Sequence, residues 1–397
     1  MDLNLRLHLH LNLLRNVRRL VSVALFATTT SCWSQLVISR DQVLSDARKT
    51  AQAQLAQIKG GVPVPDPPRK GDNPRIDWVA AVMWAGFADF ARFTGDRDCA
   101  AAVLEMGRKE NWTPILHPKL PYHADDFAIG QSFLEAWSQS PDPAIIAPIR
   151  RRADAFADFI LNQEQPAQLT WSWCDTLFMA PSVLARLSVI THDPRYLAAA
   201  DKEWGKTEDF LYDKRQHLFF RDKRYFQRRT KNGQPVFWSR GNGWVLAGIA
   251  RLLPYVPSTD PARFRYIQTF QEMAARLASL QQPDGTWRTS LLDPAEYPDS
   301  EFSGTALDCY GMAWGINNHL LNAKSYLPIV SRAWAGMLAA RRPDGLPGYV
   351  QIVAQAPGIV RAGDTRLYST GAFLLAAIEV SKLAPFPAAQ VAPLSGD

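Results

Sequence analysis

The sequence lacks the features that mark several common classes of protein. Its four cysteines form no CxxC pair and no zinc-binding spacing, so neither a structural zinc nor a disulfide framework is expected. The net charge of +6 includes no block of lysine or arginine, and no nucleic-acid-binding motif is present, so nucleic acid is not an expected partner. After residue 35 no apolar run is long enough to span a membrane.

The first 35 residues have the pattern of an export signal. Arg15, Arg18 and Arg19 form a positive region, and the apolar run from Leu20 to Thr30 is too short for a stable membrane helix. Small residues lead to Cys32. We expect a periplasmic or secreted protein, with a lipoprotein anchored at Cys32 as the weaker alternative. Residues 36–397 are expected to form one catalytic domain.

The rest of the chain repeats a unit made of two helices. The first helix of each unit is rich in alanine, glycine and aromatic residues, whereas the second carries an exposed charged face. Helices that are apolar all round are buried, and helices with one polar face lie outside. The units recur at intervals of roughly 50 to 70 residues, beginning near Asp77, Asp126, Asp175, Asn242, Asp308 and Ser369.

This pattern predicts an all-α fold, an (α/α)6 barrel of six helical hairpins. The helix over residues 41–59 is expected to complete the outer ring. A solenoid is the structural alternative, although solenoid repeats are usually shorter and more alike. In a barrel the N-termini of the inner helices converge at one mouth, so the residues that begin the units are expected to lie together there.

The stretch from Thr170 to Pro181 is the leading candidate for that mouth. Trp171, Trp173 and Asp175 stand at alternate positions directly before an apolar run. Tryptophan suits the face of a sugar, and burial beside aromatic rings raises the proton affinity of a carboxyl group. We interpret Asp175 as a general acid/base above a carbohydrate. The alternative is that Asp175 only caps the helix that follows it.

Two further stretches begin neighbouring units. His123, Asp125 and Asp126 open the second unit, and either aspartate could face Asp175. We slightly favour Asp126 as the second catalytic carboxylate. The alternative for these aspartates is again capping. The fourth unit opens with Trp238, Arg240 and Trp244.

Arg240 has a guanidinium fork suited to a substrate carboxylate. Its alternative is a surface position beside a capped turn. Met179 lies one helical turn after Asp175 and is expected on the floor beneath that carboxylate.

Three motifs in this order resemble glycoside hydrolase family 105, the unsaturated rhamnogalacturonyl hydrolases. They cover residues 171–181, 238–244 and 303–317, and the resemblance extends from about residue 41 to 383. The related unsaturated glucuronyl hydrolases share the barrel and the chemistry. The resemblance implies that the enzyme removes a 4,5-unsaturated uronic acid from the non-reducing end of pectin lyase products.

By motif position the resemblance makes Asp175 the residue that protonates C4 of the vinyl ether and activates water for attack on C5. The second carboxylate of the family falls between His123 and Asp126. Trp78, Trp173, Met179, Trp238, Arg240 and Trp244 match substrate-pocket positions of the family. The remaining alternatives are an unsaturated glucuronyl hydrolase for other glycans and a non-catalytic carbohydrate-binding barrel.

One segment departs from the family pattern. Many members carry a histidine where this chain has Arg221, which is expected to contact the substrate carboxylate instead. Arg221 lies in a polar, aromatic and basic insertion from Tyr212 to Phe237, which is expected to form a short hairpin over the site. The expected ligand is a small oligosaccharide. No cofactor and no metal are expected, and the sequence carries no signal for an oligomeric state.

Overall fold

Helices make up nearly all the regular structure in the computed structural model, which describes residues 37–60, 73–115, 117, 122–162 and 169–394. The predicted export signal lies outside these residues. Two short antiparallel strand pairs are also present: β1 (Val37–Ile38) with β4 (Phe386–Pro387), and β2 (Tyr212–Asp213) with β3 (Leu218–Phe219). None of the described helices is both long and apolar enough to cross a membrane.

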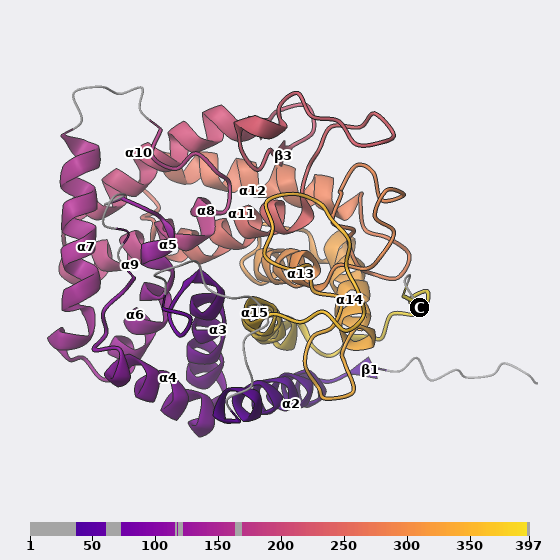
Figure 1. The fold of residues 1–397 in the computed structure, drawn as a ribbon, viewed down its shortest axis with the longest axis horizontal. Helices are drawn as coiled ribbons and strands as arrows, with labels where there is room; N and C mark the ends of the chain where they lie inside the picture. Colours follow the sequence, from indigo (N-terminus) through magenta and orange to yellow (C-terminus); the bar gives the residue numbers. More distant parts are fainter. Residues whose placement is uncertain (1–36, 61–72, 116, 118–121, 163–168, 395–397) are drawn as a thin grey trace, which may run out of the picture. The chain divides into compact units, whose positions relative to one another are not determined.

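Six inner segments form a closed ring, each in contact with the next (Figure 1). Two of the six are broken into a short and a longer helix. In order around the ring they are α3 (Trp78–Thr94), α5 (Asp125–Ala128) with α6 (Gly130–Gln139), α8 (Thr176–Met179) with α9 (Pro181–Thr191), α11 (Ser239–Leu252), α13 (Phe302–Asn317) and α15 (Leu367–Leu383).

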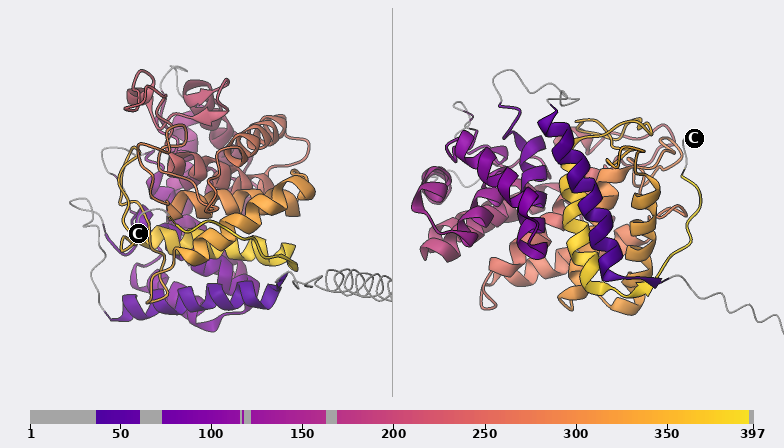
Figure 2. Two further views of the ribbon diagram at one scale, coloured as in Figure 1. Left: turned by 90° about the vertical axis from the view of Figure 1, so that its right-hand side faces the viewer. Right: turned by 90° about the horizontal axis from the view of Figure 1, so that it is seen from below.

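An outer helix packs on each inner segment. The outer helices are α4 (Arg97–Lys109), α7 (Pro143–Leu161), α10 (Pro194–Leu211), α12 (Ala262–Ala278), α14 (Ala323–Ala339) and α2 (Arg40–Lys59). Helix α2 comes first in the chain but packs on α15, the last inner helix (Figure 2). The fold is therefore the predicted (α/α)6 barrel of six helical hairpins, and the expected role of the helix over residues 41–59 is confirmed.

The inner helices are buried on every side, which explains their composition. In α13 every residue from Phe302 to Ile316 is buried. Small residues are needed where α3 and α15 cross, because a Cβ atom on Gly86 would lie 2.6 Å from the Cα of Gly371. The backbones of the first and last inner helices thus touch, and this contact closes the ring.

The break between α8 and α9 follows from one proline. Pro181 has no N–H to donate to the carbonyl of Leu177, so the first helix ends at Met179 and a new helix begins with proline at its first position. The short helix α8 is therefore a separate turn at the mouth of the barrel, directly after Asp175.

The fifth inner helix begins earlier than the sequence pattern predicted. Glu301 caps it by accepting hydrogen bonds from the N–H groups of Ser303 and Gly304. Asp308, the expected starting point, lies inside α13 and is fully buried. The prediction was wrong here because Ser303, Gly304 and Thr305 form the first helical turn in this buried setting despite their modest helix propensity.

Asp308 creates a pH-dependent cost to folding. Both of its carboxyl oxygens lack a hydrogen-bond partner within the described chain. Burial, followed by repulsion from Glu301, raises the pKa of Asp308 well above its ordinary value. Stability that depends on the protonated carboxyl is complete below about pH 4 and is lost as the pH rises towards the raised value.

We therefore expect Asp308→Asn, which cannot ionise, to raise the melting temperature at pH 7 by about 2 °C or more. The gain should shrink towards pH 4. Thermal unfolding across this pH range, with Asp209→Asn on the exposed surface of α10 as the matched control, measures the effect. A gain that did not change with pH would contradict this account.

Candidate active site

A cavity of 620 Å³ opens where the inner segments begin. Seven of its ten lining residues belong to the set predicted from the sequence. Those seven are Trp78, His123, Asp125, Trp173, Asp175, Met179 and Arg221, and the other three are Val353, Ala354 and Gln355. The expected convergence is therefore present, and the cavity brings together residues that lie up to 277 positions apart along the chain, Trp78 and Gln355.

Asp175 stands on the wall of this cavity with its carboxylate free of any capping role. It occupies the N-cap position of α8, but its side chain makes no capping hydrogen bond. Its carboxylate oxygen Oδ2 lies 3.5 Å from Nε of Arg221 and 3.5 Å from Sγ of Cys174. The alternative in which Asp175 serves as the side-chain cap of the following helix is therefore wrong, and the carboxylate is available to the cavity.

The hairpin insertion delivers Arg221 to this position. Strands β2 and β3 form the predicted hairpin, and the backbone carbonyl of Arg221 accepts a 2.9 Å hydrogen bond from the N–H of Cys174. Burial opposes its charge, yet the neighbouring Asp175 and Asp222 outweigh burial and raise the pKa of Arg221. A permanently charged guanidinium therefore lies beside Asp175.

Aromatic rings form two walls of the cavity. Trp78 is stacked on Tyr368 with 5.4 Å between ring centroids, so the plane of its indole is fixed from behind. Trp173 lies 5.0 Å from the ring of His123. The Nδ1 atom of His123 accepts a hydrogen bond from the N–H of Asp125, which leaves Nε2 to carry the proton of a neutral ring.

The structure reverses the preference between the two neighbouring aspartates. Asp125 lines the cavity, whereas Asp126 is fully buried behind it and pairs with Arg152 and His117. Consecutive residues of a helix point about 100° apart, so only one of the two can face the cavity. Burial raises the pKa of Asp126 even though His117 and Arg152 favour its ionised form.

Three side chains at and behind the cavity wall have the composition of a metal site. His117, His123 and Asp126 each offer one ligand atom, and these atoms lie within 4.8 Å of one another. The guanidinium of Arg152 already neutralises Asp126, so a cation would have to compete with an arginine for this carboxylate. This arrangement does not fit a metal centre.

Two tryptophans predicted to touch substrate are part of the core instead. Trp171 is fully buried and stacked on Phe156 with 5.2 Å between centroids. Trp244 is also fully buried and packs against Phe178 and the edge of Trp78. Trp171 therefore lies in the core while Trp173 lines the cavity, because the chain bends and turns at residues 173–175 and does not continue as an extended stretch.

Arg240 and Trp238 act behind the cavity rather than in it. Arg240 is fully buried between the rings of Trp238 and Tyr368, and it donates hydrogen bonds of 2.9 Å to the carbonyls of Gln351 and Ile352. Trp238 donates from its indole N–H to the side chain of Gln351. The predicted contact with a substrate carboxylate is replaced by anchoring of the chain at 351–352.

Sequence reasoning missed the segment from Val353 to Gln355. These residues lie in the loop that connects α14 to α15, directly after the anchored pair Gln351–Ile352, and they complete the lining of the cavity. They carry no carboxylate, histidine or tryptophan, so no chemical signal identified them. Pro357 and Gly358, shortly afterwards, mark a loop but do not reveal which part of the barrel the loop covers.

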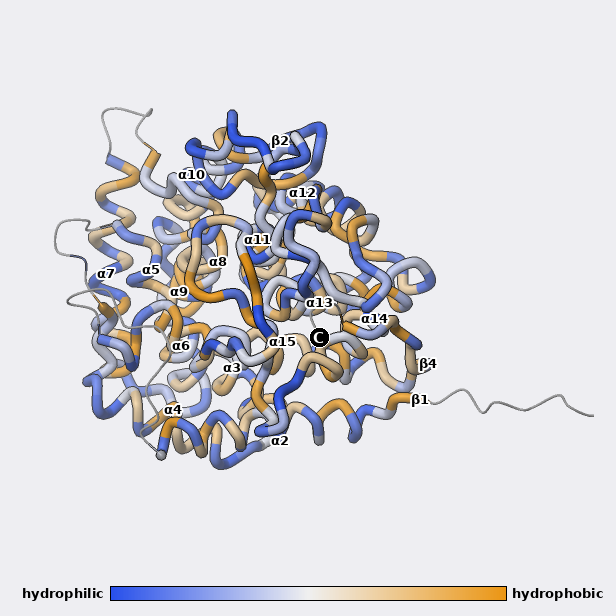
Figure 3. The backbone as a smooth tube through the Cα atoms, turned by 45° about the vertical axis from the view of Figure 1, so that its right-hand side comes forward, coloured by the Kyte–Doolittle hydropathy of each residue, from blue (hydrophilic) through white to orange (hydrophobic). Residues whose placement is uncertain are grey.

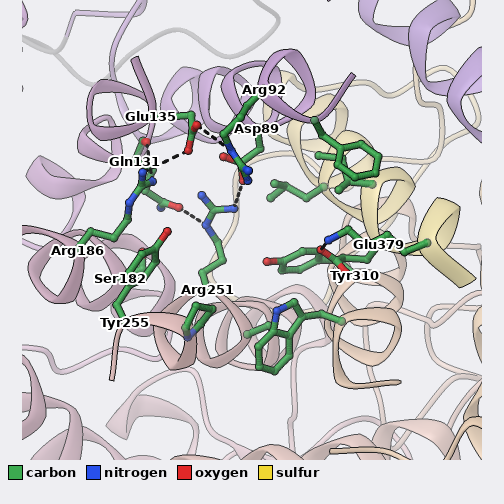
Figure 4. Close-up of a pocket in the computed structure, with 17 residues that line it drawn as sticks. Asp89, Arg92, Gln131, Glu135, Ser182, Arg186, Arg251, Tyr255, Tyr310 and Glu379 are labelled. Carbon is green, nitrogen blue, oxygen red and sulfur yellow. Dashed lines mark hydrogen bonds and ion pairs between the residues drawn. The ribbon is translucent and has the colours of Figure 1, made fainter. Parts of the chain in front are cut away.

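A second cavity, of 310 Å³, lies at the opposite end of the barrel. Figure 4 shows the side chains that line it. It is lined by residues near the C-terminal ends of the inner helices, and its charges are already paired. Arg251 donates to Asp89 and Gln131, while Glu135 pairs with both Arg92 and Arg186. This network closes the end of the barrel and leaves the 620 Å³ cavity as the candidate active site.

An aromatic cavity that holds two carboxylates and an arginine defines a site for processing an acidic carbohydrate. The chain belongs to glycoside hydrolase family 88, because the model described as Glycosyl Hydrolase Family 88 matches residues 48–384. The group of enzymes recognised from the three motifs is thereby confirmed, although the motifs resembled family 105 and the matching model is that of family 88. The protein is a glycoside hydrolase.

Two curated relatives share most of the chain. A protein of Alteromonas sp. (strain LOR), named unsaturated 3S-rhamnoglycuronyl hydrolase, is 36% identical over 83% of this chain and 83% of its own length. A Formosa agariphila protein of the same name is 35% identical over 77% of this chain and 85% of its own. A solved glycosyl hydrolase family 88 structure from Bacteroides vulgatus has a TM-score of 0.78 and 30% identity, covering 87% of this chain and 99% of that one.

Because Asp126 is buried and Asp125 lines the cavity, we expect their replacement to change the stability of the fold by different amounts. Asp126→Asn removes the negative charge that pairs with buried Arg152 and should lower the free energy of unfolding by about 3 kcal/mol. Asp125→Asn, at the cavity wall, should change it by less than about 1 kcal/mol. Urea unfolding of both variants makes the comparison, and equal losses would contradict the placement.

Replacing Arg240 should loosen the chain that it anchors. Arg240→Met removes both donors to the carbonyls of Gln351 and Ile352, so amide hydrogen exchange across 351–358 should become at least about tenfold faster. Exchange in α11 away from residue 240 should change less and serves as the internal reference. Unchanged protection at 351–358 would show that Arg240 does not hold this segment.

Proposed function

We propose that this enzyme removes a 4,5-unsaturated uronic acid from the non-reducing end of oligosaccharides released by a polysaccharide lyase, with rhamnose as the leaving sugar. Membership of glycoside hydrolase family 88 supports the reaction class. The observation that carries the proposal is the pairing of Asp175 with Arg221 inside an aromatic cavity. Asp175 supplies the proton, and Arg221 supplies a fixed positive charge for the uronate.

The site separates the tasks that this reaction needs. Trp78 and Trp173 hold the two faces of the unsaturated ring, and Arg221 binds its carboxylate as a charge-assisted pair. Asp125, which also lines the cavity, contacts the sugar hydroxyls. The ring of His123 lies against Trp173, and its Nε2–H donates to the unsaturated sugar ring.

Asp175 acts first as an acid and then as a base. Its proton passes to C4 of the vinyl ether, which leaves positive charge shared between C5 and the ring oxygen. The carboxylate that remains takes a proton from a water molecule as the water oxygen bonds to C5. The hemiketal formed in this way opens when its bond from C5 to the ring oxygen breaks, which leaves a ketone at C5 and a hemiacetal at C1. The hemiacetal then collapses to an aldehyde, its bond from C1 to the glycosidic oxygen breaks, and the leaving sugar departs with the hydroxyl proton. One carboxylate can therefore carry out both proton transfers, unlike the paired carboxylates of ordinary glycosidases.

The leaving sugar is argued from the relatives. Both curated relatives are named unsaturated 3S-rhamnoglycuronyl hydrolases, which supports a rhamnose-linked unsaturated uronate as substrate. The pectin origin expected from the sequence motifs is one source of such a linkage. A panel of lyase digests from pectin, from sulfated rhamnose-containing glycans and from glucuronate glycans distinguishes the sources.

The central prediction concerns Asp175. Asp175→Asn keeps the shape of the side chain but cannot give up the proton, so kcat/KM should fall by about 10³-fold or more, a barrier increase of about 4 kcal/mol. The measurement is the loss of absorbance of the conjugated double bond on an unsaturated uronyl–rhamnose disaccharide.

The control for this variant is its thermal unfolding, which should stay close to that of the wild type because Asp175 makes no capping hydrogen bond and Arg221 keeps its ion pair with Asp222. Turnover close to the wild-type rate would contradict the assignment of Asp175 as the proton donor. A non-catalytic sugar-binding barrel is excluded if the wild-type protein consumes the double bond and this variant does not.

A further inference from the structure

Two more cavities lie along the chain from 351 to 361, and the larger of them adjoins the active-site cavity. Their volumes are 540 Å³ and 230 Å³. The larger one shares Ala354 and Gln355 with the active-site cavity, and the two share Tyr225, Tyr297, Ala356 and Pro357 with each other. We call these two hollows together the side groove; it runs from the active site to the basic insertion.

The basic insertion supplies one wall of the side groove. Residues 223–231 carry five cations and no carboxylate, and the chain around β2 is mostly hydrophilic (Figure 3). Arg228 is exposed and lies 5.1 Å over the ring of Tyr225. Arg361, on the other wall, is exposed as well. Neither arginine is paired with a carboxylate among the residues that the structure describes.

The acidic groups of the side groove do not cancel these charges. The lining of the side groove holds two carboxylates, Glu296 and Asp364, against three arginines, Arg228, Arg229 and Arg361, so positive charge is in excess there. Arg224 differs from Arg228 because it is paired with Asp222, and its Nη2 atom, which donates to Asp222, also donates to Oε1 of Gln355 at 2.6 Å. The side groove therefore retains unpaired positive charge that begins next to the active site.

Aromatic and apolar groups stand between these charges. Tyr225 and Tyr297 line both hollows, and Ile359 on the rim is 67% exposed. Tyrosine rings pack against the faces of pyranose rings, and an exposed aliphatic side chain suits the methyl group of a 6-deoxy sugar. A basic loop that serves only solubility needs neither a hollow nor a connection to the catalytic cavity.

We propose that the side groove binds the sugars beyond the leaving sugar of an anionic oligosaccharide, with Arg228 and Arg361 contacting carboxylate or sulfate groups on them. The inference rests on the proposed function, because it assumes that the unsaturated end occupies the neighbouring cavity. It makes the enzyme selective for longer anionic lyase products over disaccharides. Charge contacts of this exposed kind are weakened by salt.

The test compares an unsaturated uronyl–rhamnose disaccharide with the tetrasaccharide of the same repeat, which adds a carboxylate beyond the leaving sugar. The wild type should show a kcat/KM about three- to tenfold higher on the tetrasaccharide, and this ratio should fall at 0.5 M salt. The double variant Arg228→Gln/Arg361→Gln should bring the ratio close to one. A second arm uses a tetrasaccharide with sulfate esters as its anionic groups.

The matched control is Arg215→Gln, an arginine of the same insertion with a 91% exposed side chain outside the side groove. It should keep the wild-type ratio. Calorimetric binding of both tetrasaccharides to Asp175→Asn, with and without the double substitution, reads the side groove independently of turnover. If neither tetrasaccharide binds more weakly after the double substitution, the proposed role of the side groove is refuted. If the double substitution weakens binding but the wild type hydrolyses neither tetrasaccharide, the proposed function is refuted instead.

Discussion

The closure of six inner helical segments into one ring is the constraint on which the rest of this structure depends. The backbones of α3 and α15 touch at Gly86 and Gly371, so the first and last inner helices can meet. Closure fixes the starting points of all six segments around one mouth. The active-site residues come from loops and helix starts that are distant in sequence, and no local interaction could gather them there.

At that mouth, the role of each side chain depends on how deeply it is buried. Side chains at the cavity wall are Trp78, Trp173, Asp125 and Asp175, whereas Asp126, Arg240 and Trp244 stand one layer behind. Of these three residues behind the wall, the two charged ones have polar or charged partners, and the third is an aromatic ring. Arg240 illustrates this arrangement, because two rings and two carbonyl groups occupy its guanidinium and leave it no access to substrate.

The hairpin insertion links catalysis to selectivity. Its first part carries Arg221 to within 3.5 Å of Asp175, and its second part places Arg228 beside the side groove. The chain from 351 to 361 separates the two, with Arg240 holding one end and Arg224 contacting Gln355. One insertion and one anchored loop thus surround the path that an oligosaccharide would follow away from the reacting sugar.

Much of the fold and part of the site could be predicted from the sequence. Alternation of apolar and one-sided helices determined the barrel, and the position of Asp175 at the start of a unit determined its place at the mouth. The sequence could not separate Asp125 from Asp126, since a one-residue difference in a four-residue helix decides which faces the cavity. It also could not show that Arg240 is buried or that Val353 to Gln355 form a wall. Those facts depend on contacts between residues more than one hundred positions apart, which only the closed tertiary structure creates.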